Sequence, residues 1–329
     1  MTAFWVLAET GPDGGLARIS AEVATLGRSL AEAAAAEVVG VVVAAEPDAA
    51  AAELARYVPR VLAIAEPAAA DHVWAMIAAQ RIAALVEERG PDLLLAGAGP
   101  DGRDLAGAVS VLTGRGILAN ATAVAWQDGG PRVEMSVFGG KLVTWSGFSG
   151  PAGIVTVRPN TVTAQPASGE APGADSVEAV TPAGELDQPA VPIVERIEEA
   201  GAAAPIEEAR IIVAGGRGVG GEEGFELVQE IADALGGAVG ATRAAVDAGW
   251  INYSQQIGQT GKIVKPQLYL ALGISGAIQH KVGMQTADTI VAVNRDPEAP
   301  IAEFADLLVV GDLFEVGRAL VDELRTRSG

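Results

Sequence analysis

Short apolar runs alternate with amphipathic stretches along the first hundred residues. The apolar runs have the length of buried strands and occupy residues 4–9, 38–45, 60–66 and 92–99. Apolar positions recur at helical spacing over residues 17–36 and 72–90, and the second stretch ends at Gly90. From about residue 124 to 162 the pattern changes to shorter β-like pieces separated by Gly and Pro. Strands that alternate with helices predict βαβ units and a mostly parallel sheet.

A stretch rich in Pro, Ala, Gly and Glu follows at residues 165–205, with one basic residue, Arg196, against eight acidic ones. Two pieces of it, residues 176–180 and 192–199, are compatible with edge strands, and we interpret the rest as loop and linker. A second alternation then begins, with strands expected at 209–215, 237–242, 267–272, 289–294 and 307–311. Helices are expected at residues 222–235, 276–283 and 313–325.

These patterns predict the α/β class with two domains, each a mostly parallel sheet flanked by helices. We expect an N-terminal α/β domain at residues 1–190, a linker at 191–207 and a Rossmann-like domain at 208–329. Half of the 329 residues are hydrophobic but only 4% are aromatic, which is typical of buried parallel strands rich in Ala, Val, Leu and Ile.

Composition excludes several classes of function. The chain contains no cysteine, which excludes disulfides, thiolate metal sites and thiol catalysis. The formal net charge of −20 argues against a nucleic acid or an anionic membrane as partner, although solubility alone accounts for such a charge. Apolar runs stay below the roughly 18 residues of a membrane span, and the start of the chain has no basic leader. We therefore expect a cytoplasmic protein that is not embedded in a membrane.

Two nucleotide-binding motifs are matched only in part. Gly216, Gly218 and Gly221 form G-x-G-x-x-G between a strand and a helix, but the next strand ends in Thr242-Arg243, where a dinucleotide fingerprint expects an acid. The piece "GQTGK" at residues 258–262 is not a P-loop, because the first glycine and the final Ser or Thr of that motif are missing.

Polar strand ends provide a stronger signal. All five predicted strands of the second domain end in Gly-rich or polar pieces, at residues 215–218, 242–249, 273–280, 294–300 and 311–314. In an open parallel sheet such ends lie along one edge, where ligands bind. Ser275 with the amides of Gly276 and Ala277 would form an anion site at a helix start, and His280, one turn further, is expected to face a ligand rather than the core. Taken singly, a histidine near a helix start or an arginine after a strand more often has only a structural role. Their joint placement along one edge of the sheet indicates a binding site for a phosphate-bearing ligand.

The residues at these strand ends also carry a family resemblance. The run from Gly240 to Val316, which reads "GATRAAVDAGW…QQIGQTGKIVKPQLYLALGISGAIQHKVGM…VNRDPEAP…GDLFEV", resembles the FAD domain of the α subunit of electron transfer flavoproteins. The resemblance extends from about Ala209 to Leu324. The first domain is similar more loosely, through "LTGRG" at 112–116 and "TVRP" at 156–159, and departs at 138–141, where "FGGK" replaces Tyr-Gly-Gly-Asn.

The resemblance implies FAD bound mainly by the second domain. By position, Arg217 would contact the pyrophosphate, Thr242 would offer a hydroxyl, and Arg243 would lie against the isoalloxazine ring. The remaining implied contacts wrap the flavin (Gly258, Gln259, Thr260), span phosphate, ribityl chain and ring (Ser275, Gly276, Ala277, Ile278, Gln279, His280), and hold the adenosine end (Asn294, Asp312, Leu313). His280 would lie by the O2 carbonyl of the ring, where a donor stabilises added negative charge.

The resemblance also implies partners and a role. It implies a heterodimer whose β subunit packs on the first domain and holds AMP or a second FAD. The protein would be an electron carrier without catalytic residues or a metal of its own, accepting electrons from acyl-CoA and related dehydrogenases of fatty acid β-oxidation. It would pass them to electron transfer flavoprotein–quinone oxidoreductase. Two alternatives stay open: a bifurcating flavoenzyme that oxidises NADH with a second FAD in the β subunit, and an adenine-nucleotide-binding regulatory protein.

Overall fold

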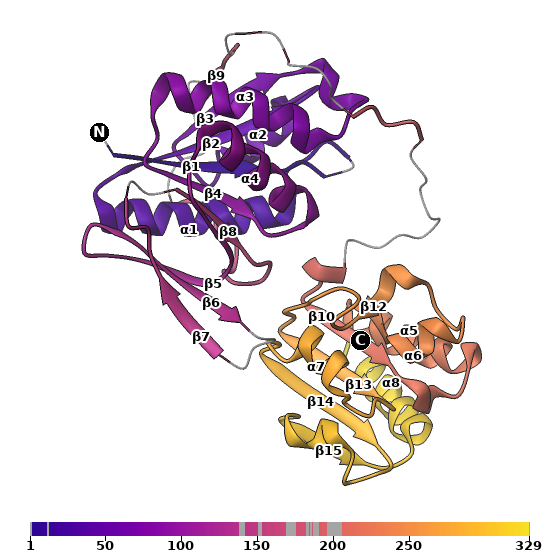
Figure 1. Cartoon of the computed structure of the whole chain (residues 1–329). Helices are drawn as coiled ribbons and strands as arrows, with labels where there is room; N and C mark the ends of the chain where they lie inside the picture. The colour runs from indigo at the N-terminus through magenta and orange to yellow at the C-terminus, as the bar shows by residue number, and fades with distance from the viewer. Residues whose placement is uncertain are drawn as a thin grey trace. The chain divides into compact units, whose positions relative to one another are not determined.

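The chain divides into two compact units, residues 1–198 and 199–329, each described by itself below (Figure 1). The computed structural model describes residues 2–11, 13–137, 142–150, 153–168, 176–181, 184, 186, 191–195 and 206–328. The "FGGK" departure at 138–141 and residues 196–205 of the expected linker lie outside the described residues. Residues 191–193, at the start of that linker, pair with the first unit, since the amide of Val73 donates to Val191 O and that of Ile193 to Asp71 O.

Nine strands among the described residues of the first unit form one sheet, in the order β7-β6-β5-β8-β4-β1-β2-β3-β9. The strands are β1 (Ala3–Ala8), β2 (Glu37–Ala44), β3 (Arg60–Ala65), β4 (Leu93–Gly97), β5 (Ile117–Gln127), β6 (Gly130–Val137), β7 (Leu142–Ser146), β8 (Ile154–Val157) and β9 (Val177–Ala179). The helices are α1 (Arg18–Ala34), α2 (Asp48–Leu54), α3 (Trp74–Arg89) and α4 (Pro100–Thr113), with a 3-10 turn at Pro67–Ala70. The pairs β5–β6 and β6–β7 are antiparallel, and the other pairs are parallel.

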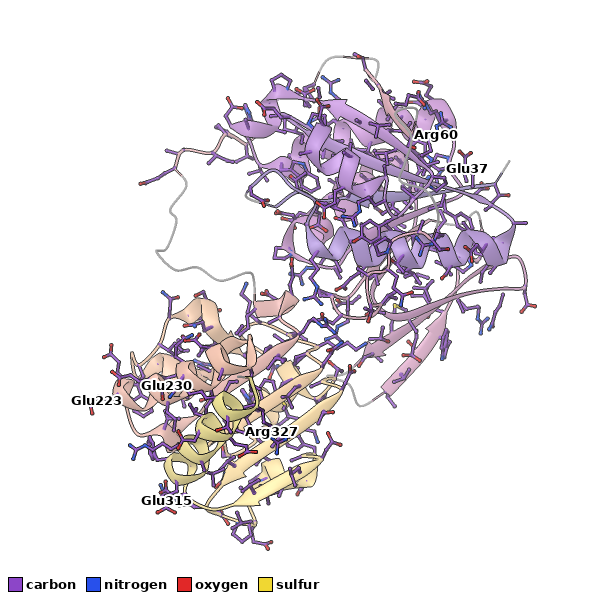
Figure 2. The ribbon with its side chains drawn as sticks, turned by 180° about the vertical axis from the view of Figure 1, so that it is seen from behind. Glu37, Arg60, Glu223, Glu230, Glu315 and Arg327 are labelled. Carbon is purple, nitrogen blue, oxygen red and sulfur yellow. The ribbon has the colours of Figure 1, made fainter. Side chains whose placement is uncertain are left out.

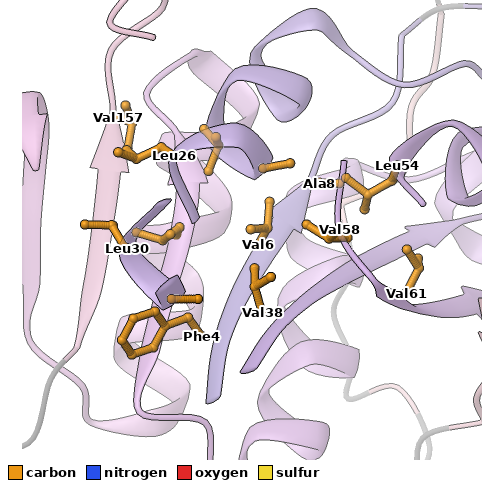
Figure 3. Close-up of a cluster of buried hydrophobic side chains, with 14 of the residues drawn as sticks. Phe4, Val6, Ala8, Leu26, Leu30, Val38, Leu54, Val58, Val61 and Val157 are labelled. Carbon is orange, nitrogen blue, oxygen red and sulfur yellow. The ribbon is translucent and has the colours of Figure 1, made fainter. Parts of the chain in front are cut away.

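Helices cover both faces of this sheet. Successive strand residues point to opposite faces, so Phe4, Val6 and Ala8 of β1 pack with the side chains of α1 and α2 (Figure 3). Trp5 and Leu7 pack instead with α3 and α4 on the other face. Because both faces are buried, the central strands must be apolar at every position, which explains the continuous apolar runs in the sequence.

The predicted fold class is confirmed, with differences at particular elements. The edge strand expected at 176–180 is β9, which pairs with β3. Helices α2 and α4 and the first half of β5 were not predicted. Helix α4 begins with Pro100 at its first turn and includes Gly102 and Gly107, so its composition is that of a loop.

The second unit contains a wholly parallel sheet, whose six strands in the described part of the chain follow the order β12-β11-β10-β13-β14-β15. They are β10 (Ile211–Gly215), β11 (Ala238–Thr242), β12 (Gln256–Ile257), β13 (Leu268–Leu272), β14 (Thr289–Asn294) and β15 (Leu307–Val310). The helices are α5 (Glu222–Leu235), α6 (Arg243–Asp247), α7 (Ile278–Met284) and α8 (Leu313–Ser328), with 3-10 turns at Ile206–Glu208, Arg217–Val219, Tyr253–Gln255 and Pro300–Glu303.

The helices of this unit divide between the two faces of its sheet. Side chains of α5, α6 and α8 pack on one face, and those of α7 and the turn Pro300–Glu303 pack on the other. The outer surfaces of α5 and α8 carry acidic residues such as Glu223, Glu230 and Glu315 (Figure 2). Strand order reverses between β10 and β13, because β11 and β12 extend to one side and β14 and β15 to the other. This reversal marks the place where a ligand is expected in an open parallel sheet.

Candidate functional site

A cavity of about 690 Å³ opens at this reversal point in the second unit. Its lining comes from the segments after β10, β11, β13 and β14, and from the loop after β12. The volume is in the range of pockets that hold cofactors and other small ligands. The carboxyl ends of parallel strands meet at one edge, so residues that are far apart in the sequence surround one space.

The floor of the cavity is made of backbone. Gly216 and Gly218 follow β10, Gly273 follows β13, and the two loops are in contact. A Cβ on Gly218 would lie 2.6 Å from Gly273 Cα, and one on Gly216 would lie 2.5 Å from Gly273 O. Glycine is required here because any side chain would separate the loops. A Cβ on Gly221 would touch nothing within 4 Å, so the G-x-G-x-x-G match reflects loop packing rather than a dinucleotide fingerprint.

One wall of the cavity is the loop after β12 together with the first turn of α7. The amide of Gln259 donates to Gln279 O at 2.7 Å, and that of Gly258 donates to Lys262 O at 3.1 Å. Gly258 has φ +142°, and a Cβ there would lie 2.8 Å from Gln279 O. Loop and helix therefore form one continuous wall.

Thr242 supplies a buried hydroxyl without a partner. It stands at the N-cap of α6 with an extended backbone, where threonine commonly bonds to the helix, but its side chain makes no capping bond. Its Oγ1 is buried and has no hydrogen-bond partner. Because an unsatisfied buried hydroxyl costs free energy, this atom indicates a polar group of a ligand that completes the site.

Charged side chains surround the opening of the cavity. Three arginines line it, Arg217, Arg243 and Arg295, against two acids, Asp247 and Asp296. Arg243 Nε lies 3.2 Å from Asp247 Oδ2, and both side chains are more than half exposed. In a chain with 22 basic and 42 acidic residues, a lining with more arginines than acids suits an anionic ligand such as a pyrophosphate.

His280 lines the cavity but belongs equally to the core. Its side chain is buried, its Nε2 lies 2.9 Å from Tyr269 Oη, and its Nδ1 lies 3.0 Å from Ile257 O. Burial lowers the pKa of His280 to about 4, and the bond to Ile257 O opposes this in part. His280 therefore lines the cavity, as expected, but it is not separate from the core, because its side chain is buried and both ring nitrogens bond to protein groups. Its part in binding a ligand stays a prediction.

Most of the predicted site residues come together in the cavity. Those that line it are Arg217, Thr242, Arg243, Gly258, Gln259, Thr260, Ser275, Ala277, Gln279, His280 and Asn294. Gly276, Ile278, Asp312 and Leu313 are not among the lining residues, so their part in binding stays a prediction. Asp312 instead caps α8 through Oδ1, which accepts from the amides of Phe314 and Glu315, and Leu313 is buried in the core.

Sequence reasoning missed other lining residues, among them Asp247, Arg295 and Asp296. A signal was present for all three, because the segments at 242–249 and 294–300 were recognised as polar strand ends. In the described part of the chain, no three His, Cys, Asp or Glu side chains are placed to hold a metal ion.

Comparison with known proteins agrees with this geometry. The family model of the electron transfer flavoprotein FAD-binding domain matches residues 205–285, and that of the electron transfer flavoprotein domain matches 4–184. The electron transfer flavoprotein subunit alpha of Mycobacterium leprae (strain TN) is 43% identical over 318 residues, which cover 96% of each chain. The chain belongs to the electron transfer flavoprotein α-subunit family. The resemblance seen in the sequence is thereby confirmed.

Two further relatives of this family extend along almost the whole chain. The electron transfer flavoprotein subunit alpha of Bacillus subtilis (strain 168) is 36% identical over 313 residues, covering 95% of this chain and 94% of its own. Protein FixB of Clostridium saccharobutylicum is 36% identical over 324 residues, covering 98% of this chain and 96% of its own. The cavity lining falls mostly within the segment that matches the FAD-binding domain of electron transfer flavoproteins. Among the described residues, no helix is both long and apolar enough to cross a membrane.

The cavity lining fits a flavin dinucleotide. The unpartnered Thr242 hydroxyl can bond to a polar group of the ligand, and Gly216 and Gly273 present backbone without a side chain to the cavity. Guanidinium groups suit a pyrophosphate.

Proposed function

We propose that this chain is the FAD-carrying subunit of a heterodimeric electron carrier. It accepts electrons from flavin dehydrogenases, typically acyl-CoA dehydrogenases, and passes them to a membrane-bound quinone oxidoreductase, acting in the cytoplasm. The observation that carries the proposal is the cavity at the strand-order reversal, with its backbone floor, its unpartnered Thr242 hydroxyl and its arginines. The family membership supports the cofactor and a β-subunit partner.

Each part of the lining has a definite task in this proposal. FAD supplies the electron-accepting and electron-donating chemistry when bound. Arg217, beside the backbone floor, holds the pyrophosphate, and Thr242 with the loop Gly258–Thr260 orients the ring. Arg243 provides positive charge toward the ring, and Asp247 holds its guanidinium by the contact at 3.2 Å. Ser275, Gly276, Ala277, Ile278, Gln279 and His280 follow the ligand along the start of α7, and Asn294, Asp312 and Leu313 lie toward the adenosine.

We also assign the domains on this basis. Residues 1–190 pack on the β subunit, residues 208–329 hold FAD, and 191–207 connect them. The β subunit holds AMP or a second FAD. The range of the lining residues supports this division, because the residues that line the cavity lie between Gly216 and Pro300, within the second domain.

The test is an absorbance spectrum of the chain co-expressed with its β subunit, followed by release of bound nucleotide on denaturation. We expect a yellow complex with one FAD per α subunit. A colourless complex that takes up no added FAD would overturn the proposal. A second flavin per heterodimer together with reduction by NADH would instead identify a bifurcating flavoenzyme.

A further inference from the structure

Lys262, the last residue of the piece "GQTGK", does not line the cavity. Its Nζ lies 2.9 Å from Oε1 of Glu207, which belongs to the 3-10 turn Ile206–Glu208 at the start of the second unit. The pair is partly buried, since 14% of the Glu207 side chain and 36% of the Lys262 side chain are exposed. The lysine that makes this piece look like a P-loop is therefore paired with a carboxylate of the chain itself.

The backbone of Lys262 closes the loop that carries three of the predicted cofactor contacts. Its amide donates to Gln256 O at 2.7 Å, and its carbonyl accepts from the amide of Gly258 at 3.1 Å. The residues enclosed between these bonds include Gly258, Gln259 and Thr260, which line the cavity. Lys262 thus forms the neck of the loop, and a displacement of the neck would move the lining residues with it.

The turn Ile206–Glu208 is itself fixed to the sheet. Ile206 is 6% exposed and belongs to the same buried cluster as Ile257 of β12, the strand that leads into the loop. The side chains of both residues meet over Gly240 of β11, because a Cβ on Gly240 would contact the Cδ1 atoms of both. The carboxylate of Glu207, next to Ile206, therefore stands on a rigid support.

We propose that Glu207 is a positioning residue for the cofactor loop, the segment Gly258–Lys262, which it holds in place through its ion pair with Lys262. This inference rests on the proposed function, because it concerns a loop that would enclose the flavin. Glu207 does not line the cavity, so it acts only through the loop. The site then depends on a residue that precedes the first strand of its own sheet.

The expected effect of losing this pair is modest, because the loop has other supports. The amide of Gln259 donates to Gln279 O of α7, and Tyr253 Oη donates to Thr260 O at 2.8 Å. Solvent also screens a partly exposed ion pair, which limits its contribution. Removal of the Glu207 charge should therefore loosen the neck of the loop without unfolding the unit.

The test measures FAD release and loop opening in the full chain co-expressed with its β subunit. Glu207→Gln keeps the shape of the side chain and removes its charge, so we expect FAD to dissociate about two- to fivefold faster. Backbone amides in peptides that cover residues 256–264 should exchange faster in the FAD-free complex. Glu230→Gln is the matched control and should change neither rate, because Glu230 pairs with Arg325 at 3.2 Å in the same unit and does not line the cavity.

Variants of Lys262 separate the effect of charge from that of packing. Lys262→Met breaks the same pair from the loop side, so its effect should resemble that of Glu207→Gln, and the two changes together should add little more. Glu207→Lys and Lys262→Glu each place like charges side by side and should speed FAD release further. The double charge swap re-forms the pair in reverse and should restore most of the wild-type rate.

Three results would overturn the inference. Unchanged loop exchange or unchanged FAD release in Glu207→Gln would do so, and Lys262→Met decides in the same way if Glu207→Gln does not fold. A double charge swap that restores neither rate would show that the two side chains act by packing alone. FAD uptake is scored separately: a complex that binds no FAD overturns the proposed function, whereas hydrogen exchange in the FAD-free complex still decides whether Glu207 fixes the loop.

Discussion

Replacing Thr242 with valine should stabilise the ligand-free protein and weaken its hold on FAD. The Oγ1 atom of Thr242 is buried and has no partner, and such a hydroxyl costs about 1–3 kcal/mol. Valine has nearly the same shape and no polar atom, so the ligand-free second unit should gain about 1 kcal/mol of unfolding free energy. If bound FAD satisfies the hydroxyl, the variant loses that hydrogen bond, and the dissociation constant should rise about 10- to 100-fold.

The assay pairs denaturant unfolding of the ligand-free complex with titration of FAD followed by flavin fluorescence. Hydrogen exchange in peptides that cover β11 and α6 assigns the stability change to the second unit. Thr242→Ser keeps the hydroxyl and should keep most of the affinity. Thr161 also has a buried Oγ1 without a partner, so Thr161→Val should change stability but not FAD affinity. A Thr242→Val protein that is less stable when ligand-free, or binds FAD as tightly as the wild type, would refute the reasoning.

Three further predictions concern the floor, the charge and the pH response. Gly218→Ala should lower the unfolding free energy by about 1–3 kcal/mol in urea unfolding, because its Cβ would lie 2.6 Å from Gly273 Cα. Gly221→Ala is the control and should lower the unfolding free energy clearly less, because a Cβ there meets open space. Equal decreases in the two variants would contradict the packing argument. Arg243→Ala should lower the flavin midpoint potential by tens of millivolts in a spectroelectrochemical titration. The shift is modest because the side chain is 65% exposed and solvent screens its charge. Arg243→Lys keeps the positive charge and should lower the potential less. No shift with FAD bound would place Arg243 away from the ring. Below about pH 6.5 the unfolded chain protonates His280 while the folded chain does not until about pH 4, so His280 contributes to a loss of stability as pH falls across that window. The loss should be smaller in His280→Gln, and parallel pH profiles of the two proteins would speak against the buried neutral ring.

The sequence predicted most of the parallel strands because both faces of each sheet are covered. Ile212, Val213 and Ala214 of β10 are buried at consecutive apolar positions, and this pattern can be recognised without knowledge of distant contacts. Strand β12 escaped prediction because it has only two residues, Gln256 and Ile257, and two residues have no periodicity. Helix α6 is five residues long and follows β11 without a loop, so it has no recognisable pattern of its own.

The site was predictable to the extent that it is a property of strand ends. Arg217, Thr242, Ser275 and Asn294 lie at or just after the ends of four different strands, and they meet because the sheet is parallel. The hydrogen bonds of His280 were not predictable, since Tyr269 in an apolar run has the pattern of an ordinary core residue. Such pairings depend on side-chain direction and on register between elements, which composition and spacing do not encode.

The fastening of the β12 loop to α7 bears on how a ligand could enter. Gly258 and Gly283 are so close that a Cβ on Gly283 would collide with the amide nitrogen of Gly258, and Gln259 N bonds to Gln279 O. Loop and helix cannot separate without breaking backbone contacts, so they move as one piece. Outside this wall, exposed lining side chains such as Arg243, Asp247 and Asp296 can move without breaking backbone contacts. Entry and exit should therefore proceed across α6 and the segment after β14, and crosslinks that immobilise those two segments should slow exchange of the bound ligand.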